Sequence, residues 1–555
     1  MNRHRNFVVA AIVVLPLLAG GFMLQERSER EGARLFQQVM DLVSERFVDT
    51  LDRGGLYERA ARGLIEELED PYTQLLSPKE YQRFNTNTGG RYGGIGMQIE
   101  DLQGYITVSR VFPHTPAENG GVFEGDRIVQ VESRSTSGWR LDQVSDSLLG
   151  KPGTPVRVRF ARPGVPEPID IQFTRAVISI PAVPYAMMLE EDIGYIPLQQ
   201  FNELASSDLE REANRLVKEG ARGLILDLRG NTGGILEQAL MISNVFLPRG
   251  AEIASVRGRG FPAQRFETEE RPSVPNTPLI VLTDGNTASA SEIVAGALQD
   301  HDRALIVGTT SFGKGLVQTV YRLDGGYALK MTTAKWYTPT GRSIQKEREL
   351  DENGRWVEVD PDSAAVHKLR AEYEERGQSV PAAFPDSVIH RVISAARPEF
   401  KSDGGRTVYG GGAITPDVLV SPDTFSTSAQ TIQKALVPQG QRVYVTLRSY
   451  ALELKPGIAS PDFAIQQAWR DELYRRLVAE DVRIDKQVWD EGREWVDQQL
   501  SYYGTRLAFG DSAWLKRDLP NDAALRRAID LLQQGRTQQD LFSIASARLP
   551  ESAPR

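Results

Sequence analysis

The stretch LIVLTDGNTASASEIVAGAL, residues 279–298, decides the fold class. It starts with an apolar run at 279–282, turns at Asp-Gly-Asn in 284–286, and continues with small and apolar residues at helical spacing. This order predicts a buried strand, a tight turn and a helix. The same alternation runs from 194 to about 420 and predicts an α/β core. Its expected strands are 224–228, 279–282 and 304–307, and its expected helices are 237–246 and 292–298.

The regions before this core have different patterns. Residues 31–84 carry apolar side chains at helical spacing, which predicts a small helical module. A Gly-rich segment at 89–96 then precedes short alternating strands, such as 105–108 and 156–160. These strands predict a compact β-rich domain that ends at about 176.

Two further segments interrupt or extend the core. Residues 346–405 are polar and charged, with a helical run near 364–376, and are interpreted as an insertion. After 423, Leu and Trp recur at helical intervals among many Arg, Asp and Gln residues, which predicts a helical C-terminal extension. We therefore expect a multidomain α/β protein with parts at 1–25, 28–85, 86–176, 177–422 and 423–555.

Composition excludes several classes of function. The chain has 555 residues, 65 Lys+Arg and 74 Asp+Glu, and its formal net charge is −9. At about 150 residues per domain, this length suggests three or four domains. An acidic chain without a Lys/Arg-dense stretch is a poor nucleic-acid binder, so we expect no nucleic-acid partner. With no cysteine, disulfides, thiolate nucleophiles, zinc ribbons and iron–sulfur clusters are excluded.

The N-terminal segment has the pattern of a targeting or anchoring sequence. Arg3, His4 and Arg5 precede an uncharged stretch at 7–24. Basic residues keep their end in the cytoplasm, so the rest of the chain is expected across the membrane. A small-x-small pattern at 19–21 would suit a cleaved signal peptide, but the apolar run continues past it, which favours an uncleaved signal anchor.

Ser289 is the first candidate for chemistry, because it lies where the strand–turn–helix segment enters its helix. The first free N–H groups of a helix suit an oxyanion next to such a serine. A structural interpretation competes locally, since Ser289 followed by Glu292 is also a capping box.

A serine nucleophile needs a base, and no histidine of the chain is well placed to be one. His301 would lie about 15 Å or more from Ser289 along a regular helix. His4 precedes the apolar segment, and the others lie in the β-rich domain or the insertion, at His114, His367 and His390. A Ser-Lys dyad is therefore the better candidate.

Lys314 is the candidate base, directly after the strand at 304–307 and between two glycines that allow close approach. A lysine acts as a base when burial among apolar groups lowers its pKa towards neutrality. Gln318 lies four residues on and could orient the amine. Taken alone, Lys314 would be interpreted as a solvated surface lysine.

The segment 308–314 also fits the phosphate-loop pattern G-x-x-x-x-G-K. That pattern requires Ser or Thr next and then a helix, whereas Gly315 follows here. Residues 317–336 have the pattern of a β-hairpin with a turn at 324–326, so nucleotide hydrolysis is rejected.

A third loop, DLRGNTGG at 227–234, follows another expected buried strand. Its free backbone N–H groups could complete an oxyanion hole. A simple turn that needs glycines with positive φ is an equally good interpretation of the loop on local grounds.

Together these segments resemble the carboxyl-terminal processing (tail-specific) peptidase family, from about 34 to 420. Six motifs in order carry the resemblance: YGGIG (92–96), LDLR with GG (226–229, 233–234), TASASE (287–292), FGKG with Gln (312–315, 318), YTPTG (337–341) and ITPD (414–417). The resemblance implies a crotonase/ClpP-like α/β protease core with an inserted PDZ domain, and no metal or cofactor.

The resemblance also implies roles for individual residues. Ser289 would be the nucleophile, Lys314 the general base and Gln318 the residue that positions it. The oxyanion donors would be the N–H groups of Ala290 and of Gly233 or Gly234.

A PDZ domain is implied for residues 86–176, with a loop that presents N–H groups to the C-terminal carboxylate of a peptide. This agrees with a Gly-rich nest beside a strand edge, where a peptide can add as a strand. The loop residues are Tyr92, Gly93, Gly94, Ile95 and Gly96.

We therefore expect an exported serine endopeptidase of a bacterial cell envelope, on the periplasmic side and anchored in the inner membrane, that cleaves proteins near their C-termini. Its partners would be protein or peptide substrates with free C-termini and, through the N-terminal segment, the membrane. A homo-oligomer or an adaptor protein remains open. The alternative is a catalytically silent PDZ scaffold, against which the joint presence of Ser289, Lys314 and Gln318 argues.

Overall fold

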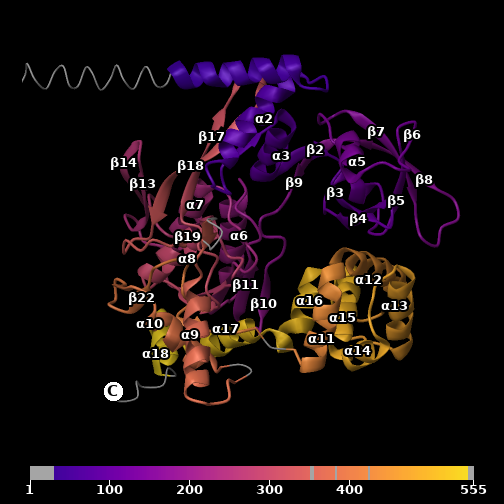
Figure 1. Ribbon diagram of the computed structural model, residues 1–555. Coiled ribbons are helices and arrows are strands. Elements are labelled where there is room, and N and C mark those ends of the chain that lie inside the picture. The colour runs from indigo at the N-terminus through magenta and orange to yellow at the C-terminus, as the bar shows by residue number, and fades with distance from the viewer. Residues whose placement is uncertain (1–29, 351–355, 382–383, 423–424, 548–555) are drawn as a thin grey trace, which may run out of the picture. The chain divides into compact units, whose positions relative to one another are not determined.

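A computed structural model describes four stretches of the protein: 30–350, 356–381, 384–422 and 425–547 (Figure 1). Among these residues, no helix is long and apolar enough to cross a membrane. The anchor expected at 1–25 lies outside the described residues.

The chain divides into two compact units, which we describe separately. The first unit consists of the chain up to Tyr81 together with Gln318–Thr332. The second unit consists of Gln82–Val317 and the chain from Thr333 onward. Ser289 and Lys314 lie in the second unit, whereas Gln318 lies in the first.

The first unit combines helices with the expected β-hairpin. Strand β17 pairs with β18, and β1 pairs antiparallel with the first part of β18. The turn contains Gly325 with φ of 69°, a left-handed conformation that suits glycine. The hairpin after Lys314 is thus confirmed, and the helix that a phosphate loop requires is not there. Residues 30–46 are helical, and the named elements are α2 (Arg53–Glu66), β1 (Gln74–Leu76), β17 (Leu316–Arg322) and β18 (Ala328–Tyr337).

The β-rich region lies in the second unit and forms an antiparallel sheet of order β3-β4-β5-β7-β8, with β6 on β5. Val156, Val158 and Phe160 alternate with more exposed residues along β7 and are fully buried in its core. Strand β3 is an edge of the sheet, with α5 beside it. The elements are β3 (Met97–Leu102), β4 (Tyr105–Val111), β5 (Arg127–Val131), β6 (Arg134–Ser135), α5 (Leu141–Leu148), β7 (Pro155–Ala161) and β8 (Ile169–Thr174).

A six-stranded sheet of order β10-β11-β12-β15-β16-β23 forms the α/β core. All neighbours are parallel except β10 and β11. The three expected strands and two expected helices are confirmed within a few residues. The elements are β10 (Met187–Leu189), β11 (Ile193–Pro197), α6 (Ala205–Lys218), β12 (Gly223–Asp227), α7 (Leu236–Phe246), β15 (Leu279–Thr283), α8 (Ala290–Asp300), β16 (Leu305–Gly308) and β23 (Val418–Leu419).

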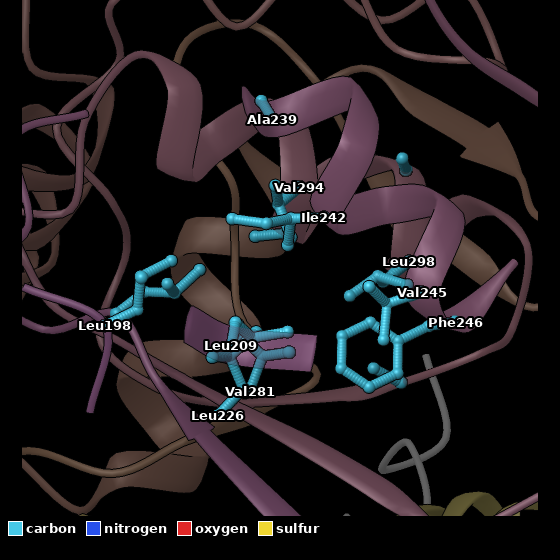
Figure 2. Close-up of a cluster of buried hydrophobic side chains, with 14 of the residues drawn as sticks. Leu198, Leu209, Leu226, Ala239, Ile242, Val245, Phe246, Val281, Val294 and Leu298 are labelled. Carbon is cyan, nitrogen blue, oxygen red and sulfur yellow. The ribbon is translucent and has the colours of Figure 1, made fainter. Parts of the chain in front are cut away.

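Helices α6, α7 and α8 cover one face of this sheet. Figure 2 shows Leu226 and Val281 from the strands in one cluster with Ile242 of α7 and Val294 of α8. The buried cluster holds α8 firmly, and every residue of this helix is buried. The helix that follows Ser289 is therefore fixed along its whole length.

The other face of the sheet is covered by the last two helices, α17 (Ala523–Gln534) and α18 (Gln538–Ala547). Ile225 and Ile280 alternate with the residues of the first cluster and pack with Leu525 of α17. The end of the C-terminal extension is thus part of the α/β core, which the sequence did not predict.

The earlier part of the extension forms a helical bundle with its own core, which includes Leu473 and Trp489. This confirms the expected helical tail. The helices are α11 (Thr427–Leu436), α12 (Gly440–Leu454), α13 (Gln467–Ala479), α14 (Lys486–Glu491), α15 (Arg493–Phe509) and α16 (Asp511–Asp518).

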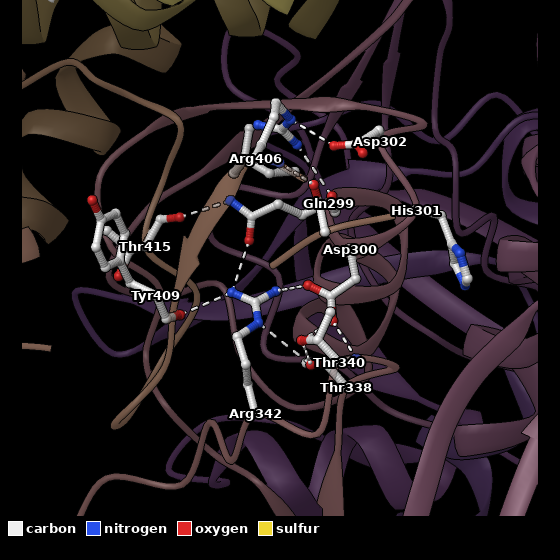
Figure 3. A network of polar contacts seen from close by, with 12 residues as sticks. Gln299, Asp300, His301, Asp302, Thr338, Thr340, Arg342, Arg406, Tyr409 and Thr415 are labelled. Carbon is white, nitrogen blue, oxygen red and sulfur yellow. Dashed lines mark hydrogen bonds and ion pairs between the residues drawn. The ribbon is translucent and has the colours of Figure 1, made fainter. Parts of the chain in front are cut away.

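A buried polar network ties two of the sequence motifs to the end of α8 (Figure 3). Arg342 pairs with Asp300, which also accepts the N–H and the hydroxyl of Thr340 at 3.0 and 2.7 Å. Gln299 donates to the carbonyl oxygen of Thr415 at 3.0 Å. The YTPTG and ITPD motifs therefore meet around α8.

The expected insertion contains α9 (Pro361–Glu375), α10 (Asp386–Ala395) and the paired strands β19 (Arg348–Leu350) and β20 (Trp356–Glu358).

Candidate active site

Three loops that the sequence singled out follow three adjacent parallel strands, β12, β15 and β16. The carboxyl ends of parallel strands lie at one edge of a sheet, where α/β proteins place their ligands. Hydrogen bonds join the loops: Ala288 N–H donates to the Asn231 carbonyl oxygen at 3.0 Å, and Phe312 N–H donates to the Thr287 carbonyl oxygen at 2.9 Å. The structure thus brings the loops of Gly233, Ser289 and Lys314 together.

Ser289 has a strained backbone, with φ of 56° and ψ of −116°. A non-glycine residue in this region is costly and persists only where its surroundings impose it, as at the sharp strand-to-helix turn that exposes a nucleophile. The residue is half-buried, and its side chain makes no capping hydrogen bond to the N-terminus of α8. The expected capping box with Glu292 is nevertheless present, since the Glu292 carboxylate accepts the N–H of Ser289.

Gly233 and Gly234 are glycines for steric reasons. A Cβ on Gly233 would lie 2.7 Å from the Ala290 nitrogen and 2.9 Å from Ser289 Cβ. A Cβ on Gly234 would lie 2.3 Å from the Phe201 carbonyl oxygen. The loop can therefore contact the Ser289 turn only without a side chain at Gly233, and Phe201 only without one at Gly234.

The backbone N–H groups of this region differ in whether they already have a hydrogen-bond acceptor. Gly233 N–H donates to Asn231 Oδ1 at 2.9 Å. Among the described residues, none accepts a hydrogen bond from the N–H of Ala290 or of Gly234. These two N–H groups are the ones left for another acceptor.

Glu292 connects the Ser289 turn to the Lys314 loop. Its Oε2 accepts the N–H of Ser289 at 2.8 Å and the N–H of Lys314 at 2.9 Å. Its Oε1 accepts the hydroxyl of Ser311 at 2.5 Å and the N–H of Gly313 at 2.7 Å. The hydroxyl of Ser311 also accepts the N–H of Ile414 at 2.7 Å. Burial raises the pKa of Glu292, and the four hydrogen bonds act in the opposite direction.

The two glycines that flank Lys314 pack closely against neighbouring residues. A Cβ on Gly313 would lie 2.6 Å from Lys346 Cγ, and one on Gly315 would lie 2.7 Å from the Gln345 nitrogen. Lys314 itself is half-buried. In the first unit, Gln318 Nε2 donates to the carbonyl oxygen of Tyr72 at 2.8 Å.

The histidines do not offer a better base. His301 Nδ1 lies 2.6 Å from an Asp403 carboxylate oxygen, and its Nε2 lies 2.6 Å from the Glu252 carbonyl oxygen. Both ring nitrogens are therefore engaged far from Ser289 along α8. In the described part of the chain, no group of three or more His, Asp or Glu side chains could hold a metal ion.

Sequence reasoning missed an ionic cluster beside these loops. Arg229 pairs with Asp227, the last residue of β12, and with Asp522, which precedes α17. A cavity of about 440 Å³ lies next to this cluster and is lined also by Trp514 and Asp518. Asp227 and Arg229 were visible in the LDLR motif, but no local pattern singled out Asp522.

The expected carboxylate-binding loop begins as a strand. Residues 92–94 lie in β2 (Arg91–Gly94), which pairs antiparallel with β9 (Ala176–Ser179), so these three are not part of a loop. The chain turns at Gly96, where φ is 91° and a Cβ would lie 2.2 Å from Thr115 Cβ. Burial raises the pKa of Tyr92 to about 12. The turn leads directly into the edge strand β3.

Comparisons with known proteins place the chain among bacterial and related proteases. The model of peptidase family S41 matches residues 192–363, and that of the PDZ domain matches residues 107–162. The carboxy-terminal-processing protease of Bartonella bacilliformis is 39% identical over 315 residues, which are 56% of this chain and 72% of that protein. The carboxy-terminal processing protease CtpA of Bacillus subtilis is 33% identical over 343 residues, 61% of this chain and 73% of that protein. Among solved structures, the photosystem II D1 C-terminal processing protease has 29% identity and a TM-score of 0.33, over 59% of this chain and 91% of that one.

Proposed function

The chain belongs to peptidase family S41, the carboxy-terminal-processing proteases, and is a serine-type peptidase with a PDZ domain. We propose that it cleaves proteins near their C-termini with a Ser-Lys dyad. Ser289 is the nucleophile, Lys314 the general base and Gln318 the residue that positions the lysine. The observation that carries this proposal is the shared Glu292 oxygen, which holds the backbones of Ser289 and Lys314 on one acceptor.

The reaction follows from these roles. The neutral amine of Lys314 accepts the proton of Ser289 Oγ as the oxygen attacks the carbonyl carbon of the scissile bond. The oxyanion is stabilised by the N–H groups of Ala290 and of Gly234 or Gly233; the bond from Gly233 to Asn231 favours Gly234. Lys314 then gives the proton to the leaving amine as the peptide bond breaks. In the second half, a water loses a proton to Lys314 and attacks the acyl carbon, and Lys314 returns that proton to Ser289 Oγ as the ester bond breaks.

The PDZ domain binds the free C-terminus of the substrate in this proposal. The turn at Gly96 presents backbone N–H groups to the carboxylate, and the peptide adds to the edge strand β3, beside α5. Amidating the C-terminus of a substrate removes the charge that these donors favour, so it should lower kcat/KM strongly. Equal cleavage of amidated and free-acid substrates would exclude carboxylate recognition.

Cleavage of a denatured protein by the purified chain tests the activity itself. The wild-type chain should cleave it and should be labelled at Ser289 by a fluorophosphonate, and Ser289→Ala should do neither. Binding of C-terminal peptides without any cleavage or labelling would instead support the silent PDZ scaffold.

We also propose that the chain acts on the periplasmic side of a bacterial cell envelope, held by its N-terminal segment. The basic residues before the apolar stretch at 7–24 support this orientation. Fractionation of cells that express the full chain should find it in the membrane fraction, accessible to protease from the periplasm. Recovery with the cytoplasmic proteins would contradict the proposal.

A further inference from the structure

We propose that Asp522, in the C-terminal extension, is a positioning residue for the Ser289 site: its pair with Arg229 fixes the loop that carries Gly233 and Gly234. This inference rests on the proposed function, because it assigns that loop to the oxyanion. It gives the extension, which lies outside both family-model matches, an indirect role in catalysis through the position of this loop.

The pair has the geometry of a strong ionic contact. Arg229 Nη1 lies 2.8 Å from Asp522 Oδ1, and Arg229 Nη2 lies 2.8 Å from Asp522 Oδ2. Such a bidentate contact fixes the plane of the guanidinium as well as its distance. The side chains are 24% and 18% exposed, so solvent screens the pair less than it screens a surface pair.

Arg229 is held on a second side by Asp227, the last residue of β12. Arg229 Nε lies 3.0 Å from Asp227 Oδ1 and Nη2 lies 2.7 Å from Oδ2. The hydroxyl of Tyr195 on β11 donates to the same carboxylate at 2.7 Å. Burial acts to lower the pKa of Arg229, but the two carboxylates outweigh it and raise the pKa above its ordinary value. The guanidinium therefore stays charged between two fixed anions.

Asp522 is itself fixed by the fold. Its Oδ1 accepts the N–H of Leu525 at 3.0 Å and caps α17. Leu525 is fully buried on that helix, against the face of the central sheet. The carboxylate is thus placed by the packing of α17, and little side-chain entropy remains to be lost when it meets Arg229.

Hydrogen bonds connect the loop after Arg229 to the turn before Ser289 and to Gly233. Gly230 N–H donates to Asp284 Oδ1 at 3.0 Å, which ties the loop to the turn before Ser289. Asn231 is fully buried, donates to the Leu198 carbonyl oxygen at 2.6 Å, and accepts the N–H of Gly233. An arginine that shifts at the start of this short loop would move the N–H groups at its end, where small displacements are costly for catalysis.

Asp522→Asn isolates the ionic contact, because asparagine also caps helices and has nearly the same shape. With a short fluorogenic peptide, we expect kcat to fall about tenfold, less than the ~100-fold loss of a deleted oxyanion donor. KM should stay within about twofold, because the loop acts on the transition state rather than on substrate binding. Asp522→Glu, which keeps the charge, should recover part of the lost kcat.

Asp497→Asn is the matched control. Asp497 also forms a bidentate contact, from Nε and Nη2 of Arg470 at 2.6 and 2.8 Å, within the helical bundle of the extension and away from the loop. Its variant removes one charge from the same extension and should leave kcat unchanged. Equal kcat values for Asp522→Asn, Asp497→Asn and the wild type would overturn the inference.

A second readout does not depend on activity. Hydrogen exchange of the segment 228–236, followed by mass spectrometry, should be faster in Asp522→Asn than in the wild type or in Asp497→Asn. Unchanged exchange of this segment would overturn the inference even in an active enzyme. Faster exchange in Asp522→Asn, together with a wild-type chain that a fluorophosphonate does not label at Ser289, would support the anchoring of the loop while overturning the proposed function.

Discussion

Arg342 and Asp300 form an ion pair from which solvent is almost wholly excluded, with side chains 0% and 1% exposed. Burial lowers the pKa of Arg342 below its ordinary value, and Asp300 acts against this effect. The pair therefore costs desolvation energy that the surrounding hydrogen bonds must offset. Gln299 and the carbonyl oxygen of Tyr409 supply two of these bonds.

The first prediction is that Arg342→Met lowers the free energy of unfolding by about 3–5 kcal/mol, because it leaves the Asp300 charge buried without its partner. Lys486→Met serves as control, since Lys486 and Asp490 form an exposed pair whose loss should have little effect on the free energy of unfolding. Urea unfolding measures both variants. Equal losses would contradict a special role for the buried pair.

Ser289→Ala and Lys314→Ala should each abolish proteolysis, and the double variant should be no worse, because the two residues act as a unit. Ser207→Ala and Lys335→Ala change exposed residues of the same types and should keep full activity. Peptide hydrolysis and circular dichroism measure activity and folding. A Lys314→Ala variant with near-wild-type turnover would rule out the dyad.

Turnover should rise with pH, because only the neutral amine of Lys314 can accept the proton of Ser289. The measurement is kcat/KM of a short peptide from about pH 5 to 9, over which the folded state is checked by fluorescence. A flat profile across this range would argue against a lysine that titrates there as the base.

Glu292→Gln should reduce both activity and stability. A carboxylate has two acceptor oxygens, whereas a glutamine amide has one oxygen and one N–H₂ group. In the variant, the N–H₂ group would face backbone or hydroxyl donors that bind a carboxylate oxygen in the wild type. We expect a loss of about 2–4 kcal/mol in the free energy of unfolding, with a larger relative loss of kcat than of substrate binding. Ser311→Ala removes one of the four donors to Glu292 and should cost less in both measurements. If Ser311→Ala were the more damaging change, Glu292 would not be the centre of this network.

Asp518→Asn should stabilise the protein at neutral pH. Burial raises the pKa of Asp518 above its ordinary value of 3.8, so the folded state binds this proton more tightly than the unfolded state does. The favourable effect on stability is fully present below pH 3.8 and is lost as the pH rises through the folded pKa. Removing the charge should therefore add up to about 1 kcal/mol at pH 7, after allowance for solvent screening of a half-exposed group. Chemical unfolding at pH 7 and at pH 3.5 should show the gain at the higher pH alone.

Local patterns in the sequence predicted much of the core. The apolar run at 279–282 and the helix after Ser289 are set by neighbours in the chain, and the hairpin after Lys314 follows from a turn of three residues. The contacts of Glu292 were only partly predictable. A capping box reveals its bond to Ser289, but its other donors lie 19 to 22 residues later.

Two features depended on distant partners and could not be predicted. Asp522 lies 293 residues from Arg229, and no periodicity relates the two positions. Residues 92–94 have the composition of a loop, yet they form a strand because β9 pairs with them from across the β-rich domain. Tertiary pairing thus overrode the local preference of the glycines.

The position of α17 and α18 in the chain has a consequence for biosynthesis. Both helices follow every strand of the central sheet, so a growing polypeptide has made the whole sheet before it makes the cover for one of its faces. Domains commonly start to fold from the N-terminal side while translation continues, at about 5–20 residues per second. Until the last helices have been made, Ile225 and Ile280 lack the apolar partners that α17 and α18 supply, and Arg229 lacks Asp522. A truncated or unfinished chain would therefore hold its nucleophile on an incompletely supported scaffold.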